Sequence, residues 1–461
     1  MMRATNKSGD FLKKLCNKER AKGELIMKKC RPAAALSALL LAALFLLSGC
    51  TSSTGKGEVS NVSMDVEQKE PDKIAKEPSQ ITFLSNGYAN SNPEDPIYRG
   101  IQLFQKETGK TVKVVQSGDQ AWQDKVIASI SAGAPIDAFS SYIQFFLTFY
   151  QGDYIQPLDD YLTSQADIFD KPMMDRFAKY DGKYYSAGAP TVPYVMFYNK
   201  KLLSDNGFEP DEPRTLYEEG KWTWKEFKRI AGECHDTGAG INGFENMYNS
   251  VFLSSNDVST VTFDGSKYEL QMNNPRLKES LEMIQDIFFK NRIAGNGWLD
   301  GQANFIKGKA AFHGTYAYDE VAFLKAKENG EIKFDFGVTA FPAGPSNKDG
   351  TSMVHASGYC ISNGAQAPYS AGRLIECILT ETVAYNKTEK HMEGSLELFD
   401  ALREHPAQCD FTDGILSAGN GSFYLLNAVF NGEDITKSIQ EFTDQYQIDV
   451  NKANERIAGK E

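Results

Sequence analysis

Histidine is scarce in this sequence of 461 residues, and the common catalytic signatures are missing. Only five histidines occur, and there is no Gly-x-Ser-x-Gly elbow, no His-Glu-x-x-His motif and no Walker loop. The pair Cys234-His235 stands alone, which is more typical of a helix end than of a metal site. The neighbouring carboxylates Glu218 and Glu219 diverge because they are adjacent in the chain. We therefore predict a protein that is not an enzyme and that needs no metal or cofactor.

Cysteine and positive charge are also in short supply. After Cys50 the chain holds only Cys234, Cys360, Cys377 and Cys409, too few for a disulfide scaffold, and any pairing among them stays open. The chain has 49 basic and 61 acidic residues, and residues 1–49 contain ten of the basic and three of the acidic ones. The remainder, with 39 basic against 58 acidic residues, carries a net charge near −19. This charge excludes nucleic acid as a partner and favours a neutral or cationic ligand.

Only one long hydrophobic run occurs, from Ala33 to Leu47. It is shorter than the roughly 20 apolar residues that a membrane-spanning helix needs. Lys28, Lys29 and Arg31 precede it, and a basic segment followed by a short apolar run is typical of a secretory signal peptide. We therefore interpret residues 1–49 as a leader that ends in a signal peptide. The 26 residues before Met27 have mixed charge and no apolar periodicity, and our hypothesis is that translation starts at Met27.

The run ends in Leu47-Ser48-Gly49-Cys50, which resembles the lipobox of bacterial lipoproteins. The resemblance implies that Cys50 is lipidated, becomes the mature N-terminus and holds an exported protein at the outer face of the cell membrane, in the periplasm if the source has an outer membrane. The alternative is a cysteine after an ordinary export signal. Residues 50–79 are polar, and we expect a flexible tether with an end-to-end distance on the order of 30 Å.

The folded part is expected to be an α/β protein with a mostly parallel sheet. It has about 380 residues, more than one hydrophobic core usually serves, so two lobes are expected. Strand-like runs alternate with amphipathic runs of helical spacing, which is typical of βαβ units. The predicted strands are Ile81 to Leu84, Thr111 to Val115 and Ile136 to Phe139, and the predicted helices are Tyr98 to Thr108, Trp122 to Ser131 and Ile143 to Tyr150.

Helix-start signals recur later in the chain. Thr223 and Glu226 have the spacing of a capping box, and Asn274 precedes a proline that suits the first turn of a helix. Trp222 and Trp224 flank the first of these starts, and we assign both to packing. Further strands are predicted at Ala310 to His313, Phe334 to Phe341 and Gly358 to Ser362.

Three segments of the chain resemble the extracellular solute-binding proteins of ABC importers, in particular the sugar-binding group that includes maltose-binding protein. The first is Asp181 to Tyr185 leading into Val192 to Lys200, with its Tyr-Asn-Lys strand end. The second is Phe305 to Gly314, with the sequence FIKGKAAFHG, and the third is Ser357 to Ser362. The three segments occur in the order and at the spacing of the family and together extend over nearly the whole mature chain. This agreement is stronger evidence than any one segment.

The resemblance implies a periplasmic-binding-protein-like fold with two α/β lobes, hinge strands and a ligand cleft between the lobes. Residues 80–191 and 316–356 are expected to form lobe 1, and residues 192–315 and 357–461 lobe 2. It also implies a monomer that captures a carbohydrate, an oligosaccharide, and delivers it to the permease subunits of an ABC transporter. The bound ligand would close the hinge, since it touches both lobes.

The resemblance also suggests which residues contact the ligand. Tyr316 is the main candidate, because it matches the stacking aromatic of the family after the returning strand, and sugar rings present C–H faces that pack on aromatic rings. The loop after the third strand departs from maltose-binding protein, which puts the same sugar in doubt. The other candidates are Tyr318, Tyr88, Asn90, Ser141, Gln144, Tyr194, Asn249, Phe423, Tyr424 and Trp122.

Two other functions fit the same fold. One is a ligand-sensing lipoprotein that reports to a membrane kinase, which needs the same hinge and differs only in its partner. The other is a binding protein for a peptide or a polyamine, since a cationic ligand is compatible with the acidic chain. A metal ligand is disfavoured by the lack of clustered His, Asp and Glu residues.

Overall fold

The computed structural model describes most of the chain from residue 71 onward. Cys50, Tyr88 and Asn90 lie outside the described residues, so the predictions on them remain predictions. Within the described part, no helix has the length and apolar character needed to cross a membrane. The described ranges are 71–85, 92–116, 122–162, 168–188, 191–295, 300–347, 350–415 and 421–459.

The end of the predicted tether belongs to the folded body. Residues Pro71–Lys76 form helix α2. Just after it, the Glu77 carboxylate accepts hydrogen bonds from the backbone N–H groups of Tyr369 and Ser370, at 2.8 and 2.7 Å. The expected boundary at residue 79 is therefore several residues too late.

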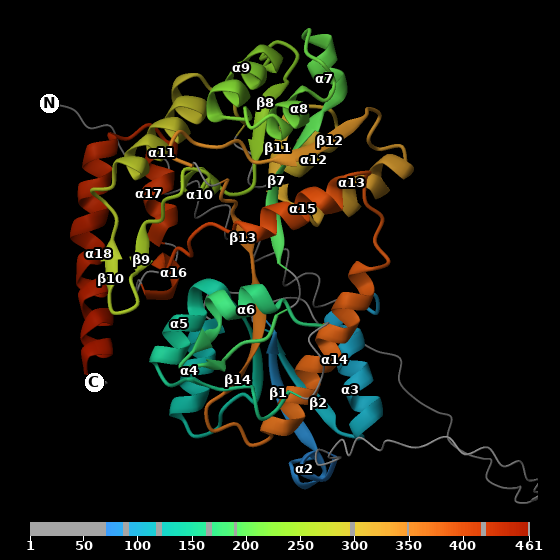
Figure 1. Ribbon diagram of the computed structural model, residues 1–461, viewed down its shortest axis with the longest axis vertical. Helices are drawn as coiled ribbons and strands as arrows, with labels where there is room; N and C mark the ends of the chain where they lie inside the picture. Colours follow the sequence, from blue (N-terminus) through green and yellow to red (C-terminus); the bar gives the residue numbers. More distant parts are fainter. Residues whose placement is uncertain are drawn as a thin grey trace, which may run out of the picture. The chain divides into compact units, whose positions relative to one another are not determined.

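The first sheet has the strand order β2-β1-β3-β14-β4. Strands β1 (Gln80–Ser85), β2 (Thr111–Gln116) and β3 (Ala138–Tyr142) are parallel, as the alternating pattern predicts. Strand β14 (Ser357–Ser362) enters antiparallel between β3 and β4 (Ile155–Gln156). Figure 1 shows α3 and α14 on one side of this sheet and α4, α5 and α6 on the other. Their bounds are Pro96–Thr108, Pro368–Asn386, Trp122–Ser131, Ile143–Gln151 and Lys171–Phe177.

Helices α3 and α14 pack unusually closely. Asp95 caps α3 by accepting a hydrogen bond from the Ile97 N–H at 2.7 Å, and Gly109 ends the helix in the left-handed region. Within α3, a Cβ on Gly100 would lie 2.4 Å from the Cα of Ile378. Only glycine allows the two backbones to approach this far.

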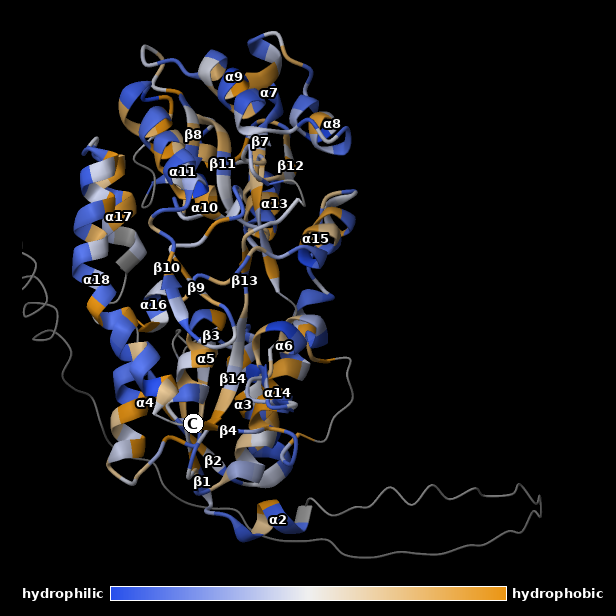
Figure 2. Cartoon of the chain, turned by 60° about the vertical axis from the view of Figure 1, so that its left-hand side comes forward, coloured by the Kyte–Doolittle hydropathy of each residue, from blue (hydrophilic) through white to orange (hydrophobic). Residues whose placement is uncertain are grey.

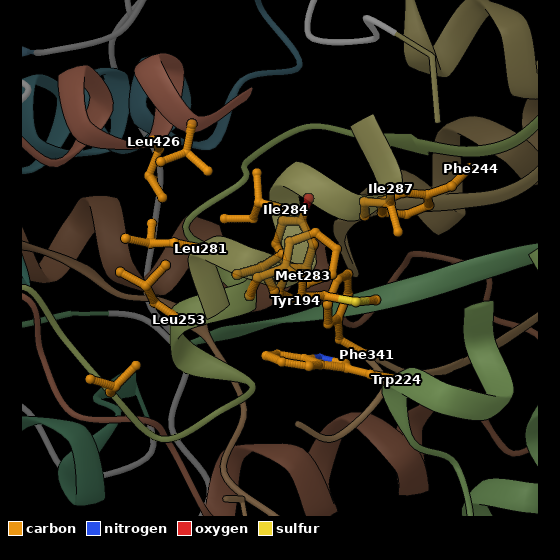
Figure 3. Close-up of a cluster of buried hydrophobic side chains, with 14 of the residues drawn as sticks. Tyr194, Trp224, Phe244, Leu253, Leu281, Met283, Ile284, Ile287, Phe341 and Leu426 are labelled. Atoms are coloured by element: carbon orange, nitrogen blue, oxygen red, sulfur yellow. The ribbon is translucent and has the colours of Figure 1, made fainter. Parts of the chain in front are cut away.

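The second sheet has the order β12-β7-β11-β8. Strand β7 (Val192–Asn199) is antiparallel to both β11 (Ala310–Tyr316) and β12 (Phe336–Ala340), and β11 is parallel to β8 (Asn242–Asn246). Helices cover both faces of the sheet, so seven of the eight β7 residues are buried. Figure 3 shows the core on one face, where Tyr194, Trp224 and Phe341 lie together.

The other elements complete the cores. In Figure 2 helix α18 (Ile435–Ala458) is coloured mostly hydrophilic, and its few buried residues, among them Phe442, Tyr446 and Val450, recur at helical spacing on one face. The elements not yet named are β5 (Lys179–Tyr180), β6 (Lys183–Tyr184), α7 (Lys200–Asp205), α8 (Glu212–Glu218), α9 (Trp224–Cys234), α10 (Val251–Ser254), β9 (Val261–Phe263), β10 (Tyr268–Leu270), α11 (Pro275–Gln285), the π-helix Asp286–Lys290, α12 (Gly301–Ile306), α13 (Asp319–Glu328), β13 (Val354–His355), α15 (Ser395–Glu404), α16 (Thr412–Ile415) and α17 (Gly421–Phe430).

The chain passes between the two sheets three times. It enters the second sheet at β7, returns through β13 and β14, and leaves the first sheet again between α14 and α15. We call the described residues within 71–188 and 357–386 the first lobe and those within 192–352 and 395–459 the second lobe, and we call residues 353–356 around β13 the hinge. The two-lobed α/β fold predicted from the sequence is confirmed.

The predicted lobe boundaries need correction. Residues 316–356 were expected in lobe 1, but β12 pairs with β7 of the second sheet over Phe336–Ala340. Residues 357–461 were expected in lobe 2, but β14 pairs with β3 of the first sheet. The crossing therefore lies at β13 and β14 and not after β11, because backbone pairing between distant segments decides which sheet each strand joins.

Candidate functional site

A cavity of about 500 Å³ is lined by both lobes and by the hinge. The first lobe contributes Trp122 and residues 142–145, and the hinge contributes residues 353–356 around β13. The second lobe contributes Tyr316 at the end of β11 and a group of residues between 248 and 259. The segment after α15 adds residues 407–410, 412 and 413, and Ser422 completes the wall.

An aromatic row runs across this cavity from one lobe to the other. It consists of Trp122, Tyr142, His355, Tyr316 and Tyr248. The His355 ring lies between Tyr142 of the first lobe and Tyr316 of the second, with both ring centroids 5.2 Å away. Trp122 contacts Tyr142 at 6.4 Å, and Tyr248 contacts Tyr316 at 5.7 Å. His355 belongs to the hinge strand, so the row joins the lobes where the chain crosses between them.

Tyr194 supports the two second-lobe tyrosines of the row, Tyr316 and Tyr248. Its ring packs edge-on against Tyr316 with centroids 5.0 Å apart. Its hydroxyl lies 2.7 Å from Asn246 Oδ1 and 2.8 Å from the Gly314 carbonyl, both acceptors. The same oxygen accepts hydrogen bonds from the backbone N–H groups of Met247 and Tyr248. Tyr194 therefore positions Tyr316 and Tyr248 and has no exposed surface for a ligand.

The aromatic groups of the row are uncharged at neutral pH. Burial lowers the pKa of His355 to about 4, so the imidazole is neutral there. Burial raises the pKa of Tyr142, Tyr248 and Tyr316 above the ordinary value, so their hydroxyl groups keep their protons and can donate hydrogen bonds. The row can therefore offer apolar ring faces and neutral polar groups to a ligand.

The carboxylate of Asp410 fixes the segment after α15 to the second lobe. It accepts hydrogen bonds from the backbone N–H of Thr260 at 2.9 Å and from the Thr260 hydroxyl at 2.7 Å. It also accepts from the backbone N–H of Thr412 at 3.0 Å and from the Thr412 hydroxyl. Asp413 follows in α16 and lines the same cavity.

A second contact between the lobes lies beside the cavity, where α5 of the first lobe meets α16 and β10 of the second. We call it the α5 contact. A Cβ on Gly414 would lie 2.3 Å from the Gln144 carbonyl oxygen. The Tyr268 hydroxyl donates a hydrogen bond to Gln151 Oε1 at 2.8 Å, and Leu147 packs into the second-lobe core. Since Gln144 also lines the cavity, the contact and the cavity share a residue.

The structure brings three of the predicted ligand residues together. Trp122, Gln144 and Tyr316 all line the cavity. Asn249 lies between the lining residues Tyr248 and Ser250, and its Oδ1 accepts a hydrogen bond from Asn246 Nδ2 at 3.2 Å.

The remaining predicted ligand residues do not line the cavity or are not described. Ser141 and Tyr194 are fully buried in the lobes. Tyr318 and Tyr424 are about half exposed and lie outside the cavity wall. The Tyr318 ring packs at a tilt against Tyr316, with centroids 5.6 Å apart. Phe423 belongs to α17, and its side chain is not described.

Sequence reasoning missed several members of the wall. Tyr142 follows the predicted ligand residue Ser141, and Tyr248 precedes the predicted Asn249, but neither tyrosine was itself predicted. His355 carried no sequence signal, because its role depends on β13 pairing with Pro193 and Val192 at the hinge. Asp413 had none either, since only the fold brings α16 to the cavity.

No metal site was found among the described residues, where no group of three or more His, Cys, Asp or Glu side chains is placed to hold an ion. Cys234, Cys360, Cys377 and Cys409 are buried free thiols. Burial raises the pKa of each, so they are protonated at neutral pH.

The sequence matches a family model described as bacterial extracellular solute-binding protein, over residues 101–391. A binding protein of Brucella abortus (strain 2308) is 25% identical over 249 residues, which are 52% of this chain and 57% of that protein. The chain thus spans little more than half the length of this relative.

Two solved structures illustrate the shared fold. An ABC substrate-binding protein from Listeria monocytogenes in complex with cycloalternan has a TM-score of 0.62 at 17% identity, covering 81% of this chain and 98% of that one. UgpB from Mycobacterium tuberculosis in complex with glycerophosphocholine has a TM-score of 0.63 at 17% identity, with the same coverage.

Proposed function

Because the chain belongs to the family of bacterial extracellular solute-binding proteins, we propose that it captures a carbohydrate, an oligosaccharide, between its lobes and delivers it to an ABC transporter. The aromatic row carries this proposal. Its rings lie along a cavity of about 500 Å³, within the usual size range of small-molecule sites. The C–H faces of sugar rings pack on such aromatic faces, while the tyrosine hydroxyls and Gln144 offer hydrogen bonds.

Ligand capture would be coupled to closure of the hinge. A ligand in this cavity contacts Trp122 and Tyr142 of the first lobe and Tyr316 and Tyr248 of the second. The closed arrangement offers both sets of contacts at once, so the ligand shifts the population toward it. A Kd near 1 μM corresponds to about 8 kcal/mol, which is weak enough for the cargo to be released to a membrane partner.

A lipid anchor at Cys50 would suit this role. A lipidated cysteine followed by a polar tether would keep the binding protein within reach of permease subunits at the outer face of the membrane. The listerial neighbour was solved with the saccharide cycloalternan, which supports a saccharide as cargo. Sensing for a membrane kinase would use the same lobes, and genes for two permeases beside this one would favour transport.

A thermal-shift screen tests the ligand class. The mature protein is heated with neutral mono- and oligosaccharides, with short peptides and with polyamines. A ligand at 100 times its Kd adds about 2.7 kcal/mol to stability, which raises Tm measurably. We expect saccharides to raise Tm, and chromatography after long incubation should recover them unhydrolysed. A shift with peptides or polyamines alone would contradict the carbohydrate assignment, and released hydrolysis products would contradict a pure binding function.

A further inference from the structure

Two exposed tyrosines contact Tyr316, the buried second-lobe ring of the aromatic row. Tyr318 is 48% exposed and Tyr248 is 37% exposed, and their ring centroids lie 5.6 and 5.7 Å from that of Tyr316. Among the described residues, only six large hydrophobic or aromatic side chains are comparably exposed. Two of these six therefore meet at a single ring of the cavity wall.

Tyr318 lies beside the cavity although it is not part of the wall. Burial is the main cause that raises the pKa of its hydroxyl, and Asp319, Tyr248 and Tyr142 raise that pKa further through their charges. Such an effect requires short distances. Tyr248 lines the cavity from the second lobe and Tyr142 from the first. The ring contacts therefore continue from the cavity through Tyr316 to an exposed ring at its edge.

The backbone that carries Tyr318 is fixed on both sides. The Ala317 N–H donates a hydrogen bond to the Pro193 carbonyl at 2.9 Å, and the Thr315 hydroxyl donates to Asp319 Oδ2 at 2.7 Å. These bonds hold the turn between β11 and α13. A tyrosine on a fixed backbone has only two side-chain torsions, so it loses little conformational freedom when a ligand covers its ring.

Tyr248 connects the cavity with the surface. It belongs to the cavity wall and still keeps more than a third of its own surface exposed. Its backbone N–H donates to the Tyr194 hydroxyl at 3.1 Å, and its carbonyl accepts a hydrogen bond from Asn246 Nδ2 at 2.9 Å. Tyr248 is therefore held as firmly as Tyr318, and we call these two residues the outer subsite.

We propose that the outer subsite binds a sugar ring of the cargo outside the cavity. This inference rests on the proposed carbohydrate function and specifies its ligand as a linear oligosaccharide that is longer than the cavity and keeps one end at the surface. The C–H face of the outermost ring packs on Tyr318, as the inner rings pack on Tyr316. The cavity of about 500 Å³ then encloses only part of the cargo.

The first test measures affinity against chain length by isothermal titration calorimetry on the unaltered protein. The probes are neutral linear oligosaccharides of glucose, of mannose and of galactose, each from one to five units. We expect affinity to rise with length until a ring reaches Tyr318 and to stay constant beyond that length. Biotin attached to one end of the longest chain should leave its affinity within about twofold, because that end is not enclosed, whereas biotin at the other end should abolish binding.

Variants locate the outer subsite. Tyr318→Ala should weaken binding of the longest saccharide about fivefold, as expected for one aromatic contact, and leave the shortest saccharide that binds within about twofold. Tyr318→Phe keeps the ring and should bind every length as the unaltered protein does. Phe289→Ala removes a ring of similar exposure, 41%, from the π-helix of the second lobe and serves as the matched control, with no expected change.

The outcomes separate this inference from the function on which it rests. Affinity that does not depend on length, rejection of biotin at both ends, or unchanged affinity in Tyr318→Ala overturns the outer subsite and leaves a carbohydrate-binding protein. An equal loss at every length in Tyr318→Ala also overturns it, since Tyr318 would then act only by supporting Tyr316. If no saccharide of any length binds, the proposed function itself fails.

Discussion

Gly414 offers a direct test of the link between the α5 contact and ligand binding. In the structure a methyl group at this position would lie 2.3 Å from the carbonyl oxygen of Gln144 and 3.1 Å from Thr148 Oγ1. A Cβ and a non-bonded oxygen atom stay at least about 3.0 Å apart, so in Gly414→Ala helices α5 and α16 must separate by roughly 0.7 Å or more. Overpacking of this kind costs about 1–3 kcal/mol.

The cost should fall on the closed state. If α5 and α16 separate when the lobes open, the added methyl group penalises only the arrangement in which they touch. Gly414→Ala should then weaken ligand affinity by roughly 5- to 150-fold, because the lost free energy is a coupling between closure and binding. The folding of each lobe by itself should change little.

The assay has two parts. Isothermal titration calorimetry with the saccharide that raises Tm most gives the affinity, and small-angle X-ray scattering with and without that ligand reports closure. Gly232→Ala is the control, since its added Cβ meets no atom within 4 Å and the site lies inside helix α9. We expect the control to bind as the unaltered protein does. If Gly414→Ala also binds normally, or loses stability without losing affinity, the α5 contact does not change on closure and the reasoning is refuted.

Three further predictions concern binding and stability. Tyr316→Phe should keep the fold and weaken saccharide binding, measured by calorimetry, about fivefold, because one hydrogen bond is lost. Tyr316→Ala should also lower the unfolding free energy by about 3–5 kcal/mol, because the ring is only 6% exposed. Unchanged affinity in Tyr316→Phe would show that the hydroxyl does not reach the ligand. Burial lowers the pKa of His313 to about 3. Below pH 6.5 the unfolded state therefore binds a proton at His313 that the folded state does not bind. The contribution of His313 to the unfolding free energy should fall by about 1.4 kcal/mol for each pH unit below 6.5. Urea titrations of His313→Phe should therefore show a flatter pH dependence than the unaltered protein, and a slope equal to that of the exposed-site control His405→Asn would contradict this. Gly100→Ala should lower the unfolding free energy by more than about 1 kcal/mol in urea, because its Cβ would lie 2.4 Å from the backbone of Ile378; full stability would mean that α3 and α14 can separate without cost.

Local signals predicted local structure well. Helix α4 spans Trp122–Ser131 as its periodicity predicts, and the side chain of Asn274 caps α11 by accepting a hydrogen bond from the Arg276 N–H. The packing role assigned to Trp222 is confirmed, since its ring is buried and its indole N–H donates to the Ala340 carbonyl at 2.9 Å. These outcomes depend on neighbours in the chain or on burial alone.

The capping box at Thr223 and Glu226 shows where local reasoning fails. The helix starts as predicted, but the side chain of Thr223 caps nothing. Its backbone instead forms an isolated bridge with Ala343, and Glu226 pairs with Arg229 at 2.8 Å. A backbone bridge to a distant segment and an ion pair within α9 replaced the local reciprocal bonds.

The sequence by itself determined the two-lobed α/β class and most element positions, and it selected Tyr316 and Trp122, which both line the cavity, because periodicity, glycine and proline positions and motifs can be read from the chain without its contacts. Only the tertiary structure decided which sheet β12 and β14 join, because strand pairing is a contact between distant segments. It also placed His355 between Tyr142 and Tyr316, and Asp413 at the cavity wall. These groups come from the hinge and from three separate parts of the chain, so no single stretch of sequence could show that they meet.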